Sequence, residues 1–202
     1  MNDKALFKLS YGLFVLTANK DGKDNGCIIN TVCQVTDNPK QISITVNKDN
    51  LTHDMIKDTS KFTVSVIAEN ASFDLFKRFG FASGRDTDKF AGFDGAKTAG
   101  NGTKIVTEGT NAYILAWVTD TVDLGTHTMF IATVTDMEVL SDIPSATYAY
   151  YHAHIKPQPA ENKSDKKVWK CRICGYEYDG QDLPDDYICP ICKHPASDFE
   201  LV

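Results

Sequence analysis

Residues 26–36, GCIINTVCQVT, decide how the first part of the chain folds. The stretch is rich in apolar and β-branched residues, the turn-forming run 36–39 (TDNP) closes it, and a second apolar run follows at 41–46. Apolar runs between turn residues are typical of neighbouring β-strands. Residues 47–53 (NKDNLTH) then open a helical pattern, so we expect two strands followed by a helix at 50–59.

Similar apolar and β-branched segments continue through the first 140 residues. Short turn clusters such as 20–22 (KDG) and 123–125 (DLG) separate them. The predicted strands are 11–18, 26–35, 41–46, 62–68, 111–122 and 126–139, and the predicted helices are 3–10, 50–59 and 72–79. This pattern predicts a mainly β fold, a β-barrel with a few helices.

The composition of the 202 residues restricts the possible partners. The formal net charge is −6 and no basic run is longer than Lys166-Lys167, so we expect no nucleic-acid partner. Charged residues interrupt the apolar runs near the N-terminus, and no later stretch has the length and apolar character of a membrane span. We therefore expect a cytoplasmic protein with no membrane partner.

Two Cys-x-x-Cys pairs lie near the C-terminus. Cys171 and Cys174 form the first pair, Cys189 and Cys192 form the second, and fourteen residues separate the pairs. Because we expect no secretion to an oxidising compartment, this spacing favours a metal site over disulfides. Four thiolates accept either zinc or iron, so the spacing alone leaves the metal open.

The stretch 156–167 (KPQPAENKSDKK) separates the predicted strands from the cysteine pairs. It is rich in Pro, Lys and Ser and has no apolar periodicity. We therefore expect three parts: a barrel domain at 1–155, a linker at 156–167 and a metal-binding domain at 168–202.

The residues around the cysteines resemble rubredoxins over 168–202. The resemblance is carried by 169–171 (WKC), 174–178 (CGYEY), 183–187 (LPDDY), 189–192 (CPIC) and Phe199. It implies a single iron held by Cys171, Cys174, Cys189 and Cys192, with a small aromatic core. The segment between the pairs is short, as in the iron modules of rubrerythrins, and Lys193 stands where glycine is common. The alternative is a zinc ribbon that only stabilises the tail.

The first 155 residues resemble the flavin reductase family with the FMN-binding split-barrel fold. Six segments in order carry this resemblance: GCIINTVCQVT, SITVNKDNLTHDMI, FTVSVIAE, RFGFASGRDTDKF, DLGTHTMFIATV and TYAYYHAH. The resemblance implies an isoalloxazine site and a ribityl-phosphate site. The isoalloxazine residues are Asn30, Thr31, Val32, Cys33 and Gln34. The ribityl-phosphate residues are Asn47, Lys48, Thr52 and His53, with Arg85 and Lys89 as further phosphate candidates.

The resemblance also places His127, in a Gly-x-His motif, where the nicotinamide approaches the flavin. From the residues alone, a lone histidine such as His127 is more often structural than reactive, and Asn50 or Thr52 is an ordinary helix cap.

The fusion of these two parts resembles the high-molecular-weight rubredoxins. It implies that NADH, or NADPH, reduces FMN, that FMN reduces the iron, and that the iron reduces a partner such as a flavodiiron protein. The family also implies a homodimer. Two alternatives stay open: a flavin reductase that supplies reduced FMN to a monooxygenase, and a carrier reduced by another flavoprotein without any nicotinamide site.

Overall fold

The computed structural model describes residues 2–157, 168–180 and 182–202. The chain divides into two compact units, 1–157 and 158–202, which are described separately. Most of the predicted linker, 158–167, lies outside the described residues.

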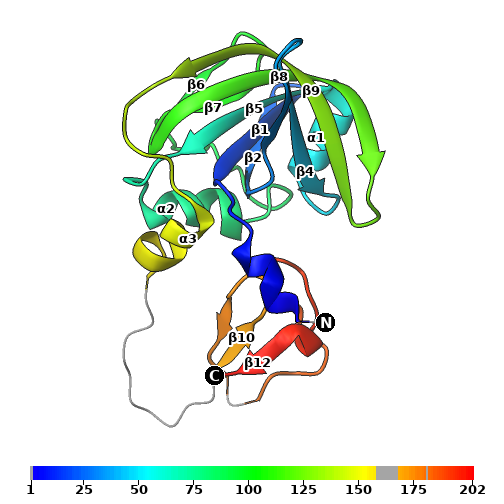
Figure 1. Cartoon of the computed structure of the whole chain (residues 1–202), viewed down its shortest axis with the longest axis vertical. Helices are drawn as coiled ribbons and strands as arrows, with labels where there is room; N and C mark the ends of the chain where they lie inside the picture. Colours follow the sequence, from blue (N-terminus) through cyan, green and yellow to red (C-terminus); the bar gives the residue numbers. More distant parts are fainter. Residues whose placement is uncertain (1, 158–167, 181) are drawn as a thin grey trace. The chain divides into compact units, whose positions relative to one another are not determined.

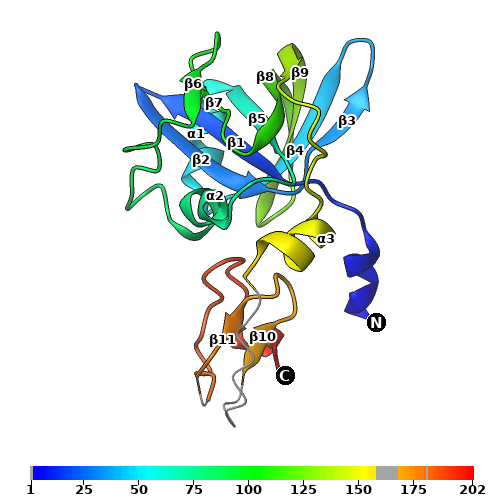
Figure 2. The ribbon, with the colours of Figure 1, turned by 90° about the vertical axis from the view of Figure 1, so that its left-hand side faces the viewer.

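A curled seven-stranded sheet forms the frame of the first unit, in the order β2-β1-β5-β8-β9-β4-β3 (Figures 1 and 2). Its strands are β1 Phe14–Lys20, β2 Lys23–Ile29, β3 Cys33–Thr36, β4 Gln41–Asn47, β5 Lys61–Ile67, β8 Thr110–Asp123 and β9 His127–Val139. The edge strands β2 and β3 are consecutive in the chain, and the four residues from Ile29 to Cys33 span at most about 14 Å. A flat sheet of this size would separate its edges by about 29 Å. The sheet must therefore curl, and the predicted barrel is confirmed.

The helix α1, Leu51–Thr59, packs against β1 and β2 and buries one face in the barrel. It begins after Asn50 and ends where Ser60 adopts a left-handed conformation, with its N–H bonded to the carbonyl oxygen of Ile56 at 2.8 Å. Asn50 is the N-cap, but its side chain makes no capping hydrogen bond. Met55 and Ile56 from the buried face join a core with residues of β1, β2, β4, β5, β8 and β9.

A second core, which combines aliphatic and aromatic side chains, lies under the helical segments α2 and α3 of the barrel. These are α2, Phe73–Phe76, continued by a π-helical turn, Lys77–Phe81, and α3, Tyr148–Tyr150, continued by a second π-helical turn, Tyr151–Ile155. Tyr151 packs on Phe76 with ring centroids 4.4 Å apart. The tyrosine- and histidine-rich end of the barrel domain therefore packs partly on its own chain.

This fold differs from the expectation in several places, and the helical segment 148–155, α3 with its π-helical turn, was not predicted. The predicted strand 26–35 is two strands, β2 and β3, because the chain bends at 30–32. The short strands β6, Ala96–Thr98, and β7, Lys104–Val106, pair with each other and were not predicted. The predicted helix at 3–10 is a 3₁₀-helix, Asp3–Lys8.

The second unit is a small three-stranded sheet, β11-β10-β12. Its strands are β10 Trp169–Cys171, β11 Glu177–Tyr178 and β12 Phe199–Leu201, with a 3₁₀ turn at Ala196–Asp198. Phe199 is buried, and the rings of Tyr176 and Tyr187 meet it edge-on at 6.5 and 5.5 Å. The predicted aromatic core of this unit is confirmed. Among the residues that the structure describes, none of the helices combines the length and apolar character needed to cross a membrane.

Candidate functional site

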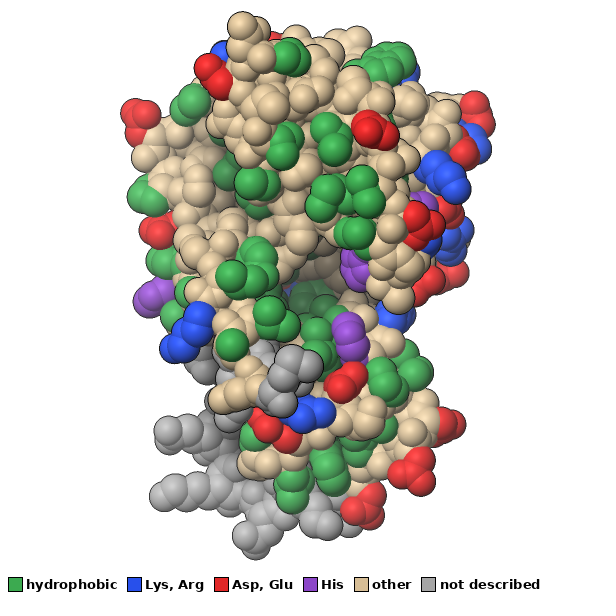
Figure 3. Space-filling view, turned by 45° about the vertical axis from the view of Figure 1, so that its right-hand side comes forward, with side chains coloured by type: hydrophobic (Ala, Val, Ile, Leu, Met, Phe, Trp, Pro, Cys, Tyr) green, Lys and Arg blue, Asp and Glu red, His purple; other side chains and the backbone are tan. Residues whose placement is uncertain are grey.

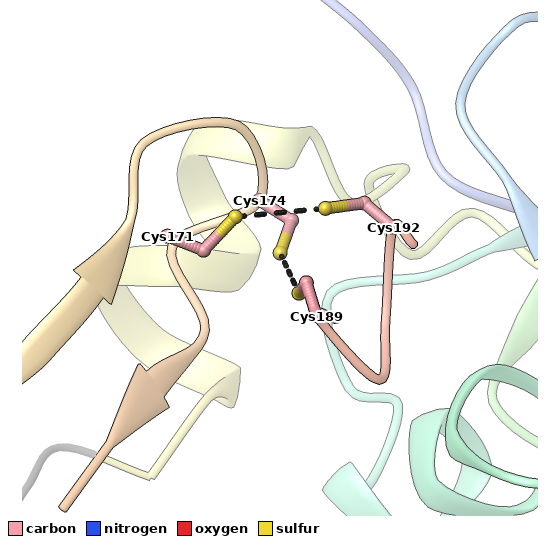
Figure 4. A group of neighbouring side chains, drawn as sticks. All are labelled: Cys171, Cys174, Cys189 and Cys192. Carbon is pink, nitrogen blue, oxygen red and sulfur yellow. Dashed lines mark hydrogen bonds between the residues drawn. The ribbon is translucent and has the colours of Figure 1, made fainter. Parts of the chain in front are cut away.

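The four C-terminal cysteines converge on one point, each pair entering on its own loop (Figure 4). All four sulfur atoms lie within 4.8 Å of one another. The Sγ atoms of Cys171 and Cys192 are 3.5 Å apart, and those of Cys174 and Cys189 are 3.4 Å apart. A tetrahedral ion with metal–sulfur bonds near 2.3 Å would hold its sulfurs about 3.8 Å apart. The donor set therefore fits one tetrahedral metal ion.

Each cysteine loop is closed in the same way. Gly175 donates its N–H to the carbonyl oxygen of Cys171 at 2.8 Å, and Lys193 donates to that of Cys189 at 2.9 Å. Further backbone N–H groups point at the sulfurs: that of Tyr176 bonds to Cys174 and that of His194 to Cys192. Such N–H donors stabilise negative charge on the sulfurs and tune a bound metal.

The proximity and burial of the sulfurs shift the pKa values of the cysteine thiols. Hydrogen bonding from Cys174 lowers the pKa of the Cys192 thiol to about 4, whereas burial raises the pKa of the Cys171 thiol to about 11. The hydrogen bond to Cys192, followed by burial, raises the pKa of Cys174 as well. Four thiolates can form together only when a positive ion balances their charge.

In the barrel, the bend between β2 and β3 holds three of the predicted isoalloxazine residues, Asn30, Thr31 and Val32. The Thr31 hydroxyl donates to the carbonyl oxygen of Thr45 at 2.7 Å and accepts from the N–H of Thr45 at 3.2 Å. This side chain bonds to both backbone polar groups of Thr45 in β4, so it fixes the bend. The next two predicted residues, Cys33 and Gln34, lie in β3 and are exposed.

A second group gathers where β4 ends beside the β8–β9 turn. Asn47 pairs with His127 across the ladder, and the backbone N–H of Lys48 bonds to the carbonyl oxygen of Thr126 at 3.0 Å. The Lys48 ammonium donates to both carboxylate oxygens of Asp123, at 2.7 and 2.9 Å. The structure thus brings three predicted residues, Asn47, Lys48 and His127, to one edge of the barrel.

A hydrogen-bonded chain links two more predicted residues, His53 and Arg85. Arg85 donates to Asp54 at 2.7 Å, and the other Asp54 oxygen lies 3.0 Å from His53 Nδ1. His53 Nε2 lies 2.9 Å from the Thr128 hydroxyl. Because an ionised carboxylate only accepts, Nδ1 carries the hydrogen, and in the neutral imidazole Nε2 accepts from Thr128. Both ring nitrogens of the buried His53 are therefore engaged within the protein.

Two predicted phosphate residues are buried in the fold. Thr52 is fully buried and accepts from the Asn25 amide at 2.9 Å. The Lys89 ammonium donates to the carbonyl oxygens of Gly26 and Phe79 at 2.8 and 3.1 Å, and burial lowers its pKa. In this conformation, Lys48 and Arg85 are the predicted cations that retain solvent exposure, 36% and 49% of their side chains. Two accessible cations beside amide and hydroxyl groups fit a phosphate-bearing cofactor.

Sequence reasoning missed Asp54 and Asp123, which pair with these cations, and Thr128, which contacts His53. Both aspartates have a pKa below the ordinary value: Asp54 because of its hydrogen bond from His53 and then Arg85, and Asp123 because of Lys48. The adjacency of His53 and Asp54 and of His127 and Thr128 was a weak signal in the sequence. No spacing rule connects Lys48 with Asp123, 75 residues away.

Comparison with known proteins agrees with this division. Residues 6–158 match the family model of the flavin reductase like domain, and residues 169–200 match that of the rubrerythrin, rubredoxin-like domain. A high molecular weight rubredoxin from Moorella thermoacetica is 39% identical over the full length of both chains. A ferric-chelate reductase (NAD(P)H) from Archaeoglobus fulgidus is 40% identical over 75% of this chain and 89% of its own.

Solved structures share the barrel fold at lower identity. The NADH:FAD oxidoreductase of Streptomyces globisporus superposes with a TM-score of 0.63 at 19% identity, over 71% of this chain and 84% of its own. The flavin reductase PheA2 superposes with a TM-score of 0.60 at 23% identity, over 73% of this chain and 93% of its own.

The curled barrel and the four-cysteine centre thus define a flavin reductase-like protein fused to a rubredoxin-like domain. The chain belongs to the high molecular weight rubredoxins. Its cofactors are FMN for the barrel and one iron for the four cysteines.

Proposed function

We propose that this protein takes reducing equivalents from NADH, or from NADPH, into its barrel and delivers them through its four-cysteine centre to a separate acceptor protein. One observation carries the proposal: a complete four-sulfur site and a flavin reductase-like barrel occur in one chain. FMN, when bound, can accept a hydride, and iron in four thiolates carries one electron at a time, so their fusion converts two-electron into one-electron transfer.

The residues of the barrel divide into binding and positioning roles. Asn30, Thr31, Val32, Cys33 and Gln34 would line the isoalloxazine, with the Thr31 hydroxyl fixing the bend rather than binding the ring. Lys48 and Arg85 would bind the phosphate, since both are accessible cations. Asn47 lies beside Lys48, while Thr52, His53 and Lys89 would support the site from inside the fold.

His127 would lie near the nicotinamide. It begins β9, it is half-buried, and its Nδ1 lies 2.9 Å from the Thr126 hydroxyl. No strong acid or base is needed, because hydride transfer relies on the cofactor while the protein orients the reactants. The ferric-chelate reductase (NAD(P)H) relative supports a pyridine nucleotide as the donor.

Electrons would leave through the more exposed side of the metal centre. Cys174 and Cys192 are half-buried, whereas Cys171 and Cys189 are fully buried. Ile173 beside Cys174 is 42% exposed, so an apolar contact with a partner can form there. Residues 168–202 contain three basic and seven acidic side chains, a net charge of −4, which suits a basic docking surface.

The acceptor would be a flavodiiron protein or a similar flavoprotein of the cytoplasm. A putative diflavin flavoprotein from Nostoc is 32% identical over 136 residues, but the match covers only 23% of that protein. There the barrel is one part of a longer flavoprotein, which supports electron transfer between this kind of barrel and another flavoprotein unit.

We also propose a homodimer. Several large apolar side chains of β3, β8 and β9 are at least 43% exposed in the single chain: Val35, Trp117, Val122, Met137 and Val139. A second copy would cover part of this apolar surface. The mass measured by sedimentation equilibrium tests this proposal, and a monomer at micromolar concentration would contradict it.

Anaerobic titration with NADH tests the main proposal. We expect the flavin absorbance to bleach and the ferric-thiolate absorbance to follow. If neither changes while a chemical reductant bleaches both, the protein is a carrier reduced by another flavoprotein. If the flavin bleaches, dissociates on reduction and leaves the iron oxidised, the protein supplies reduced FMN to another enzyme.

A further inference from the structure

Both accessible cations of the proposed phosphate site are already paired with carboxylates. Lys48 contacts Asp123 through two short hydrogen bonds, at 2.7 and 2.9 Å, and Arg85 contacts Asp54 at 2.7 Å. Figure 3 shows acidic and basic side chains intermingled along one edge of the barrel. An incoming phosphate would therefore meet cations whose charge is balanced.

Asp123 is held by the backbone of its own turn as well as by the Lys48 ammonium. Its Oδ1 atom accepts the backbone N–H of Gly125 at 2.7 Å, inside the β8–β9 turn. The backbone N–H of Lys48 donates to the carbonyl oxygen of Thr126 in the same turn. The N–H of Leu124 donates to the carbonyl oxygen of His127 and closes the turn. The carboxylate cannot move far from Lys48 without breaking its bond to the turn.

The charge of Asp123 must therefore oppose a phosphate at Lys48. A phosphate ester carries close to two negative charges at neutral pH, and a fixed carboxylate within a few ångströms repels it. The Asp123 side chain is 73% exposed, so solvent and salt weaken this repulsion.

We propose that Asp123 is a specificity-determining residue that competes with the phosphate of FMN for Lys48 and weakens binding of phosphate-bearing flavins relative to riboflavin. This inference rests on the proposed phosphate site at Lys48. Asp123 would keep the ammonium in place before the cofactor binds, and it would make FMN binding sensitive to salt.

The substitution Asp123→Asn isolates the charge. An asparagine keeps an oxygen that can accept the Gly125 N–H, so the turn is preserved. The matched control is Asp37→Asn, which removes a carboxylate that pairs with Lys40 at 3.3 Å before the start of β4. Lys48 follows the other end of this strand, about 20 Å away, which exceeds the screening length of physiological salt.

The test compares FMN and riboflavin binding to the cofactor-free full chain by quenching of flavin fluorescence. We expect Asp123→Asn to tighten FMN binding roughly two- to fivefold at physiological salt, as expected for one exposed ion pair, without changing riboflavin binding. The gain should shrink at high salt and be absent in Asp37→Asn.

Unchanged or weaker FMN binding by Asp123→Asn would overturn the inference while leaving the phosphate site standing. A different result would contradict the proposed phosphate site itself. If Lys48→Ala weakens FMN and riboflavin equally, Lys48 does not bind phosphate, and the role of Asp123 falls with it.

Discussion

Gly175 and Lys193 occupy equivalent positions in the two cysteine loops. Each follows the second cysteine of its pair, each adopts a left-handed backbone conformation, with φ of 74° and 61°, and each donates its N–H to the carbonyl oxygen of the first cysteine. Glycine adopts this conformation without strain, whereas a residue with a Cβ atom costs about 1–2 kcal/mol there. The second loop therefore carries strain that the first avoids.

Lys193→Gly should stabilise the metal-binding unit by up to about 1 kcal/mol, since the relief of strain exceeds the added flexibility of the unfolded chain. Unfolding by guanidinium, followed through the iron absorbance, measures the change. Lys193→Ala removes the same charge but keeps the Cβ atom, so it should gain little. Equal gains from both variants would assign the effect to charge.

Cys174→Ser should abolish electron delivery to the acceptor while NADH still bleaches the flavin, because the barrel has its own core and site. Iron content shows whether the centre is lost, and reduction of an added acceptor protein measures delivery, with anaerobic bleaching of the flavin in the same sample as the internal control. Undiminished electron delivery to the acceptor by a variant without iron would contradict the proposed electron transfer through the cysteine centre.

Thr31→Val should destabilise the barrel by roughly 1–3 kcal/mol, because it leaves the backbone N–H and C=O of Thr45 without the hydroxyl that binds both. Urea unfolding of the cofactor-free protein measures this loss. Thr31→Ser keeps the hydroxyl and should recover most of the stability. If serine is as harmful as valine, packing of the methyl group matters more than the hydrogen bonds.

Asp54→Asn should change the dependence of stability on pH. The hydrogen bond from His53 and the Arg85 pair lower the pKa of folded Asp54 below its ordinary 3.8, so the carboxylate stabilises the fold above this value. That contribution is lost as the pH falls through the lower pKa of the folded state. The difference between wild type and variant should be constant near neutral pH and shrink below about pH 4. Urea midpoints from pH 7 to 3 measure it, with Asp37→Asn as control; a difference that persists at pH 3 would contradict the assignment.

The sequence predicted what depends on local pattern. Helix α1 was expected at 50–59 and spans Leu51–Thr59, and the four cysteines were found from spacing alone. The bend at 30–32 was missed because its cause, the contact of Thr31 with Thr45, lies fourteen residues away. Burial of Lys89 and the pairing of Lys48 with Asp123 also depend on distant segments, so no periodicity could show them.

The two units have separate hydrophobic cores among the described residues: three clusters lie within the barrel unit, and the fourth consists of residues around the cysteines. A substitution in one of these clusters changes the packing within its own unit. Evolution can adjust the reduction potential at the cysteines without re-optimising the barrel, and can lose or replace the small unit as a whole. The Archaeoglobus relative, whose match covers three quarters of this chain and most of its own length, is consistent with such independent inheritance.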